Sequence, residues 1–226
     1  MNNVGKFPGA SIFARLDSHE VSALESQAEI RGYKAGEWIV QYGDIWPFFF
    51  FIDKGEMTAI KESFEGRSLV LTTLHAGDVF WGLAFFIEAA PMPASLRAIQ
   101  DTELMLWPRE ALIPLFLRNG RLSWDLSCLM IQRVQLASEI VEKLAFHPVA
   151  GRLARLLLDR SDKAEPGLRH RDLTLDEMAA RIGTTREVVS RFLHRFADDG
   201  AITITRTEFS ITDHEKLEAL AQKVKG

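Results

Sequence analysis

Residues 173–202 have the sequence LTLDEMAARIGTTREVVSRFLHRFADDGAI, and this stretch decides the fold of the second half of the chain. It opens with Thr174 and Glu177, whose spacing of three is typical of a capping box at the start of a helix. Apolar residues then recur at helical spacing until Gly183 interrupts the pattern. The stretch therefore predicts a short first helix that ends at this glycine.

A second helix is predicted directly afterwards, because Thr184 and Glu187 repeat the capping-box spacing and the helical pattern continues to about Ala197. One face of this helix is apolar: Val188, Val189, Phe192, Leu193 and Phe196. The other face is polar: Arg186, Glu187, Ser190, Arg191 and His194. In the DNA major groove, Arg pairs with guanine and Glu accepts from the amino group of cytosine. The polar face therefore suits a helix that enters this groove.

An ordinary surface helix with a solvated charged face is the alternative. Two features argue against it. The helix–glycine–helix spacing is typical of a helix-turn-helix. Residues 201–212, AITITRTEFSIT, alternate apolar and polar side chains around a short polar centre, as a β-hairpin does. Together these features predict a winged helix-turn-helix.

Composition places the chain among ordinary globular proteins. Of its 226 residues, 47% are hydrophobic and 26% are charged. No apolar run is long enough to span a membrane, and the N-terminus lacks the hydrophobic core of a signal peptide. The single cysteine, Cys128, excludes a disulfide framework within one chain and a four-cysteine iron–sulfur site. We therefore expect a cytoplasmic protein with no membrane association.

The charge is unevenly distributed. The whole chain carries a net charge of −4. Residues 148–226 hold 14 Lys and Arg against 13 Asp and Glu, whereas residues 1–147 hold 13 against 18. The basic share therefore lies in the half that contains the helix-turn-helix, where contacts to DNA phosphates would be made.

The first half of the chain predicts short strands. A short amphipathic helix is expected over residues 17–30, with Asp17 or Ser18 as its cap. The strand candidates that follow are Trp38–Tyr42, Phe48–Ile52, Met57–Lys61, Leu69–Leu74 and Leu104–Trp107. Glycines separate these strands, which is typical of a small antiparallel barrel or jelly roll. We therefore predict an antiparallel β-roll.

A long helix is predicted over residues 122–146, after a short helix that ends at Gly120. Its apolar residues alternate steps of four and three, as in a heptad seam that packs two copies of a helix together. The predicted seam consists of Met130, Val134, Ala137, Val141 and Leu144. The alternative is that this face packs on its own domain.

The predicted fold class is α+β, with three segments in order. Residues 1–119 form the β-roll sensor domain, and residues 120–147 form the dimerisation helix. Residues 148–226 form the winged helix-turn-helix DNA-binding domain, which begins with a further helix over residues 149–159.

This order of elements resembles the Crp/Fnr family of transcription regulators. The resemblance covers nearly the whole chain, and four segments carry it: FFFIDKGEM (49–57), HAGDVF (75–80), ASEIVEKLAFHPVAGRLARLLLD (137–159) and IGTTREVVSRFLHRFADDGAI (182–202). It implies a homodimer that binds a palindromic double-stranded DNA operator. It also implies contact with RNA polymerase, through which transcription would be either activated or repressed.

The family's recognition-helix pattern implies roles for individual residues. Arg186, Glu187 and Arg191 match the base contacts of Crp-like members, and Glu187, Ser190 and Arg191 match those shared with Fnr-like members. The phosphate-contact candidates are Thr184, Thr185, His194, Arg206 and Thr207.

The sensor segment departs from the family's cyclic-AMP-binding pattern. Gly82 stands where such receptors hold the ribose with a Glu, and Met92–Pro93 stands where an Arg–Ser pair holds the cyclic phosphate. On the long helix, Ala137–Ser138 replaces the Thr–Ser pair that meets adenine. A buried phosphate without a positive partner costs several kcal/mol. The sequence therefore predicts an effector other than cyclic AMP.

The residues left at the effector position are mainly apolar. The predicted pocket consists of Phe80, Trp81, Gly82, Leu83, Met92 and Ser138. Three alternatives remain open: a filled core without ligand, a small effector, or a haem pocket. WGLAFF (81–86) and LMLWP (104–108) resemble the nitrogen-oxide-responsive Dnr/NnrR branch, which favours haem. The candidate axial ligands are His75, Met92, Met105 and His147. The His and Cys positions used by the family's carbon-monoxide sensor are Leu83 and Trp81 here.

Functions from other classes fit less well. The chain contains no Walker A, HExxH, CxxC or GxGxxG motif and no Ser–His–Asp arrangement, so we do not expect an enzyme. A cyclic-nucleotide-binding signalling module without a DNA-reading role is the alternative function, since it would share the β-roll. Such a module would lack the helix-turn-helix and would keep the phosphate-binding Arg.

Overall fold

The computed structural model describes residues 12–161, 169–170, 173–205 and 208–223. The chain divides into two compact units. One comprises residues 1–61 and 71–135, and the other comprises residues 62–70 and 136–226. The division falls inside the long helix α4 (Gly120–Phe146) and does not isolate that helix as a separate segment.

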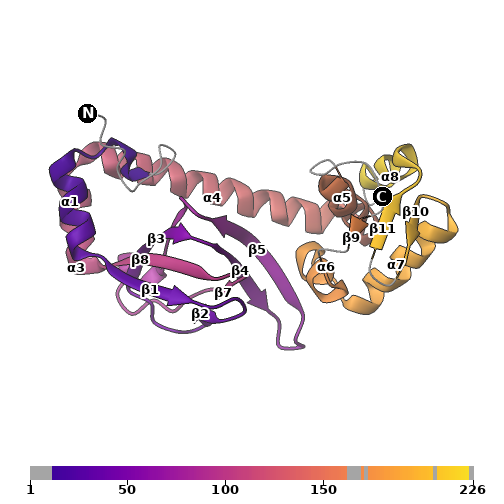
Figure 1. The fold of residues 1–226 in the computed structure, drawn as a ribbon, viewed down its shortest axis with the longest axis horizontal. Coiled ribbons are helices and arrows are strands. Elements are labelled where there is room, and N and C mark those ends of the chain that lie inside the picture. Colours follow the sequence, from indigo (N-terminus) through magenta and orange to yellow (C-terminus); the bar gives the residue numbers. More distant parts are fainter. Residues whose placement is uncertain (1–11, 162–168, 171–172, 206–207, 224–226) are drawn as a thin grey trace. The chain divides into compact units, whose positions relative to one another are not determined.

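The first unit contains a β-roll of two four-stranded sheets and the helices packed on it (Figure 1). One sheet has the strand order β1 (Glu29–Tyr33), β8 (Thr102–Pro108), β3 (Phe48–Lys54) and β6 (Val79–Trp81). The other has the order β2 (Trp38–Val40), β7 (Ser95–Ala98), β4 (Glu56–Glu62) and β5 (Ser68–His75). Residue 62 of β4 and residues 68–70 of β5 are assigned to the second unit. The helices are η1 (Ile12–Arg15), α1 (Ser18–Gln27), α2 (Leu83–Phe86), α3 (Arg109–Arg118) and the first part of α4.

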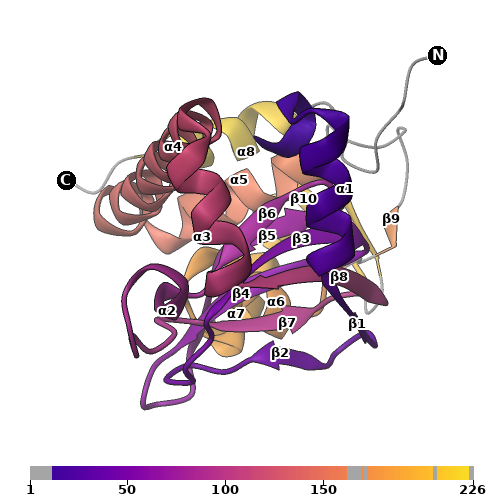
Figure 2. The same cartoon turned by 90° about the vertical axis from the view of Figure 1, so that its left-hand side faces the viewer.

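Strand β3 shows why this fold needs a continuous apolar run. Successive side chains of a strand point to opposite faces of the sheet. Phe49 and Phe51 join the core cluster with residues of α1, α3 and α4, while Phe50 and Ile52 join the cluster between the two sheets. All four are almost completely buried. The sheet therefore has an apolar cluster on each face, one of them shared with the helices that Figure 2 shows beside it.

Every strand predicted from the sequence is present, with ends that differ by a few residues. Three strands of the first unit, β1, β6 and β7, were not predicted. The helix predicted over residues 17–30 ends at Gln27, because the chain turns at Ala28 and continues as β1 against β8. Asp17 is its cap and forms a capping box with Glu20. The predicted α+β class with an antiparallel β-roll is confirmed.

The second unit contains the winged helix-turn-helix (Figure 1). Its elements after α4 are α5 (Val149–Ser161), β9 (Arg169–His170), α6 (Leu175–Ile182), α7 (Arg186–Asp198), β10 (Ile202–Ile204), β11 (Glu208–Ile211) and α8 (His214–Ala221). Strands β10 and β11 form the predicted hairpin, and β9 pairs with β11 as a third strand that was not predicted. One apolar cluster joins α5, α6, α7, α8 and the hairpin.

Candidate functional site

Helix α7 presents the polar face that its sequence predicts. Val189, Leu193 and Phe196 are buried in the core of the second unit. The opposite side leaves these residues exposed or, for Ser190, partly exposed: Arg186, Glu187, Ser190, Arg191 and His194. Packing of the apolar side against α5, α6 and the hairpin fixes the helix on its unit, so that the polar side chains share one free surface.

The turn between α6 and α7 positions the start of this surface. Thr174 and Glu177 form the predicted capping box of α6, in which the Thr174 hydroxyl accepts the Glu177 N–H and the Glu177 carboxylate accepts the Thr174 N–H. Gly183 ends α6 in the left-handed conformation, with φ of 65°. Residues with a Cβ rarely adopt this conformation, so a glycine suits the tight turn.

The predicted capping box of Thr184 with Glu187 is wrong. Thr184 still belongs to the turn, since its N–H donates to the Ala179 carbonyl, and the cap of α7 is Thr185 without a side-chain capping bond. The Glu187 carboxylate instead accepts hydrogen bonds from its own N–H and from the Thr185 hydroxyl, and the positive charge of Arg186 attracts it electrostatically. These contacts hold the pKa of the Glu187 carboxyl below its usual range, which keeps it an acceptor.

The two arginines of the surface have different environments. Arg186 Nη1 lies 3.5 Å from Asp176 Oδ2 in an ion pair with both side chains exposed. Such pairs contribute about 0–1 kcal/mol, so this one can open when a DNA base competes for the guanidinium. The Arg191 guanidinium carbon lies 5.7 Å from the ring centroid of Phe192, and its side chain is exposed.

The predicted phosphate contacts are placed in part. Thr184 and Thr185 lie in the turn before α7, and His194 lies on its exposed side. Arg206 and Thr207 lie outside the described residues.

The sequence analysis did not identify Arg152 of α5, which has a structural role. Its Nε donates to the Ile182 carbonyl at 2.8 Å, and its Nη1 donates to the His147 carbonyl at 2.6 Å. Arg152 thereby ties the end of α6 to the end of α4.

Helix α4 carries an exposed apolar face. Trp124, Ile131, Val134 and Val141 are 60–68% exposed, and spacings of seven, three and seven residues place them on one side of the helix. The predicted seam overlaps with this face only in part. Met130 packs against the core of the first unit, and Leu144 lies against the backbone of Gly183 in the second. Ala137 is exposed.

The predicted effector position is closely packed around Gly82. A Cβ at residue 82 would lie 1.9 Å from the Trp46 carbonyl oxygen and 2.8 Å from its Cδ1 atom. The Trp46 backbone cannot move aside without a large cost in free energy, so a glutamate side chain has no room at residue 82. The ribose contact of cyclic-AMP receptors is therefore sterically excluded from this position while Trp46 stays where it is.

The position predicted to match the phosphate contact of cyclic-AMP receptors is occupied by apolar packing. Met92 is 2% exposed and belongs to the cluster between the sheets. Its N–H donates to the Asp44 carbonyl and its carbonyl accepts the Gly43 N–H. The backbone of Met92 is therefore hydrogen-bonded to the loop that precedes β3. Phe80 and Trp81 stack on each other, while Ser138 is exposed on α4. Leu83 begins α2 and is partly buried.

The candidate haem ligands of the first unit lie in three different environments. Met92 belongs to the cluster between the sheets, whereas Met105 belongs to the cluster on the helix-covered face. His75 is exposed, with Nδ1 3.9 Å from a Glu56 carboxylate oxygen. His147 belongs to the second unit and accepts the Arg152 contact through its carbonyl. Met92 and Met105 are packed in apolar clusters, so neither sulfur can bind a haem iron without displacement of its neighbours.

Two buried nitrogen donors near the effector position were missed by the sequence analysis. Arg133 of α4 places its guanidinium carbon 5.8 Å from the ring centroid of Phe80. Its Nε atom and Trp46 Nε1 have no hydrogen-bond partner among the described residues. Burial lowers the pKa of Arg133, against an attraction by Asp78 that raises it. No sequence pattern signals either residue, because both depend on packing between distant segments.

Comparison with known proteins identifies the family. A Crp-like helix-turn-helix domain model matches residues 151–220, and a cyclic nucleotide-binding domain model matches residues 30–119. The cyclic AMP receptor protein of Thermus thermophilus is 28% identical over 216 residues, which cover 94% of this chain and 97% of that protein. The chain belongs to the Crp/Fnr family of transcription regulators.

Further relatives agree with this assignment. The cAMP-activated global transcriptional regulator CRP of Escherichia coli is 28% identical over 183 residues, or 79% of this chain and 87% of that protein. A crystal structure of a crp/fnr family transcriptional regulator from Eubacterium rectale has a TM-score of 0.79 at 21% identity, covering 96% of this chain and 99% of the other, and shows the same fold. The Escherichia coli and Eubacterium rectale proteins are both transcriptional regulators.

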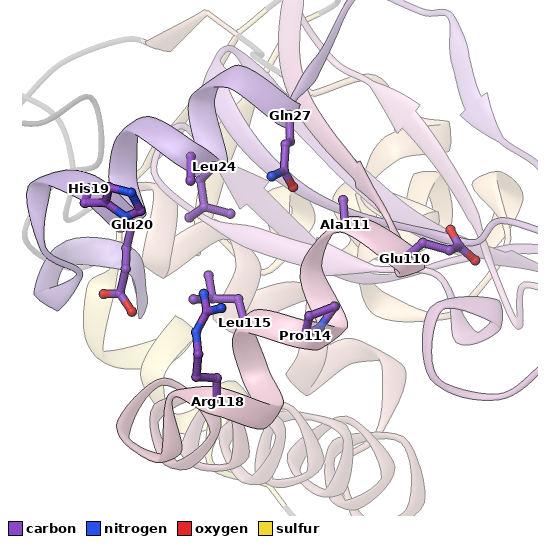
Figure 3. A pocket seen from close by; sticks show the side chains of 10 residues that line it. His19, Glu20, Leu24, Gln27, Glu110, Ala111, Pro114, Leu115 and Arg118 are labelled. Atoms are coloured by element: carbon purple, nitrogen blue, oxygen red, sulfur yellow. The ribbon is translucent and has the colours of Figure 1, made fainter.

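Other surface features of this Crp/Fnr regulator lie apart from the predicted effector residues. A groove of about 260 Å³ runs between α1 and α3 (Figure 3). Glu20 and Arg118 lie near one end of it and Gln27 lies near the other. None of the predicted pocket residues lines this groove. Within the described part of the chain, no helix is both long and apolar enough to cross a bilayer.

Proposed function

We propose that this Crp/Fnr regulator binds a palindromic operator as a homodimer, and that an effector other than cyclic AMP controls it through the β-roll. The observation that carries the proposal is the exposed polar face of α7, with Arg186, Glu187 and Arg191 on a helix fixed by its buried side. A palindromic operator follows from the two-fold symmetry of a homodimer, which presents two recognition helices about one DNA turn apart.

The exposed face of α4 supports the homodimer. Four large apolar side chains on one side of a helix are unfavourable in water, and a second copy of the same helix would cover them. A two-fold contact uses the same residues from both chains, so each of the four would face its counterpart or a near neighbour.

Glu187→Gln is expected to change the operator preference without unfolding α7. Glutamine can still accept the Thr185 hydroxyl bond, but its amide also donates and so no longer favours the cytosine amino group. We predict a shifted base preference at one position of each half-site, measured by selection of both proteins on a library with randomised half-sites. An unchanged base preference would show that Glu187 only stabilises the start of α7 and does not read a base.

Millimolar cyclic AMP is expected to change neither the melting temperature nor the operator affinity. Gly82 and Met92 supply neither the carboxylate nor the positive charge that the ribose and phosphate would need. Ligand stabilisation requires preferential binding to the folded state, so thermal unfolding with and without the nucleotide measures this directly. A saturable rise in melting temperature would overturn the assignment of the effector class.

Three finer assignments belong to the same proposal. WGLAFF (81–86) and LMLWP (104–108) support placement in the Dnr/NnrR-like branch of the family. The family resemblance supports control of transcription through RNA polymerase. The proposed binding of operator DNA places its action in the cytoplasm, where that DNA is located.

A further inference from the structure

Arg133 is a half-buried cation whose Nε lacks an acceptor within the described part of the chain. Its guanidinium lies over the face of Phe80, at 5.8 Å from the ring centroid. Its Nε is buried and has no hydrogen-bond partner among the described residues. Asp78 attracts it electrostatically, but the Asp78 carboxylate accepts the backbone N–H of His75 at 2.8 Å. The aromatic contact alone does not satisfy this donor.

Trp46 provides a second unsatisfied donor in the same region. Its indole ring packs against the cluster between the sheets, as Phe80 does. Its Nε1 is also buried without a hydrogen-bond partner in the described part of the chain. Buried N–H groups in folded proteins are hydrogen-bonded with few exceptions. Two exceptions around one apolar cluster indicate a missing acceptor.

We propose that the effector is a small organic carboxylate with an apolar body, which Arg133 recognises through its guanidinium beside Phe80. This inference rests on the proposed function, since it names the effector class of that regulator. Guanidinium and carboxylate form a charge-assisted, often bidentate pair. A monoanion matches the single positive charge, whereas a doubly charged phosphate would be left with excess charge among apolar side chains. Phe80, which is only partly buried, supplies surface for the apolar body, and Trp46 Nε1 is a second donor for an oxygen.

A charge-matched ligand panel tests the proposal. Benzoate, phenylacetate and octanoate are each compared with their neutral primary amides in thermal unfolding of the full chain. We expect at least one carboxylate to give a saturable rise of roughly 5–10 °C at a hundredfold excess over its Kd. Its amide should give none. Arg133→Gln should weaken the response at least about tenfold, because it removes the charge and keeps a polar side chain.

Arg97→Gln is the matched control. Arg97 also stacks on an aromatic ring, with its guanidinium carbon 5.3 Å from the centroid of Trp38, but its Nε donates to the Gly36 carbonyl at 2.9 Å. This variant should keep the full carboxylate response. If no carboxylate shifts the wild-type melting temperature, or if Arg133→Gln responds like wild type, the proposal is wrong.

Arg133→Met gives a second, ligand-free readout. Replacing an unpaired buried cation by an apolar side chain of similar length should leave the melting temperature unchanged or raise it. A clear drop would show that Arg133 is already paired, for instance with the second subunit, and would contradict the proposal. Operator binding distinguishes this failure from failure of the proposed function, since the DNA-binding face of α7 does not include Arg133.

Discussion

Arg191→Ala is expected to weaken operator binding roughly 10- to 100-fold, because one bidentate contact to guanine contributes about 1–3 kcal/mol of discrimination. Arg191 lies one helical turn beyond Glu187 on the exposed side of α7 and is not held in an ion pair that the structure describes. The variant should also lose its preference for guanine at one position of each half-site. Titration of the operator and of single-base variants measures both effects.

Two comparisons separate base reading from general electrostatics. Arg155→Ala removes an exposed arginine of α5 that pairs with Asp159, and should change operator affinity by less than Arg191→Ala does. His194→Ala, at a predicted phosphate contact, should weaken binding to all sequences alike. An Arg191→Ala protein with the wild-type guanine preference would contradict the role of Arg191 in base reading.

Val141→Asp is expected to dissociate the dimer. Val141 is 65% exposed in the single chain and lies on the apolar face of α4, where a symmetric contact would bring two new carboxylates together. Both would lose water without a positive partner, which costs several kcal/mol. Operator affinity should then fall by several orders of magnitude, since two half-sites would no longer be bound as one unit. Sedimentation at micromolar concentration measures the assembly.

Gln132→Asp controls for the added charge. Gln132 is exposed on α4 and lies outside the apolar face, so this variant should remain dimeric. Retention of the dimer by Val141→Asp would show that the apolar face does not form the subunit contact. Dissociation of both variants would indicate a general loss of helix stability instead.

The sequence predicted the DNA-binding part well because its signals are local. The capping box of α6, the left-handed Gly183 and the period of α7 each depend on neighbours within a few residues. The wrong prediction of Thr184 as the cap of α7 also concerns contacts within a few residues. Two candidate caps stand side by side, and the turn geometry, which hydrogen-bonds Thr184 back to Ala179, selects Thr185.

The sensor part was predicted less completely because its decisive contacts are long-range. Gly82 is explained by the backbone of Trp46, which meets it only when β3 and β6 pair. Likewise, the helical spacing of apolar residues in α4 is compatible with two neighbouring apolar faces, and the sequence alone does not choose between them. Packing of Met130 on the first unit and of Leu144 on Gly183 leaves the stripe through Trp124, Ile131 and Val141 exposed.

Selection of the wild-type protein on a fully randomised duplex library tests the central claim most directly. If this Crp/Fnr regulator reads DNA as a homodimer through α7, the enriched sequences should contain an inverted repeat. The centres of its half-sites should lie about one helical turn, roughly 10 base pairs, apart. Each half-site should include a guanine whose enrichment Arg191 requires. Enrichment of a motif without two-fold symmetry, or of no motif at all, would contradict the account.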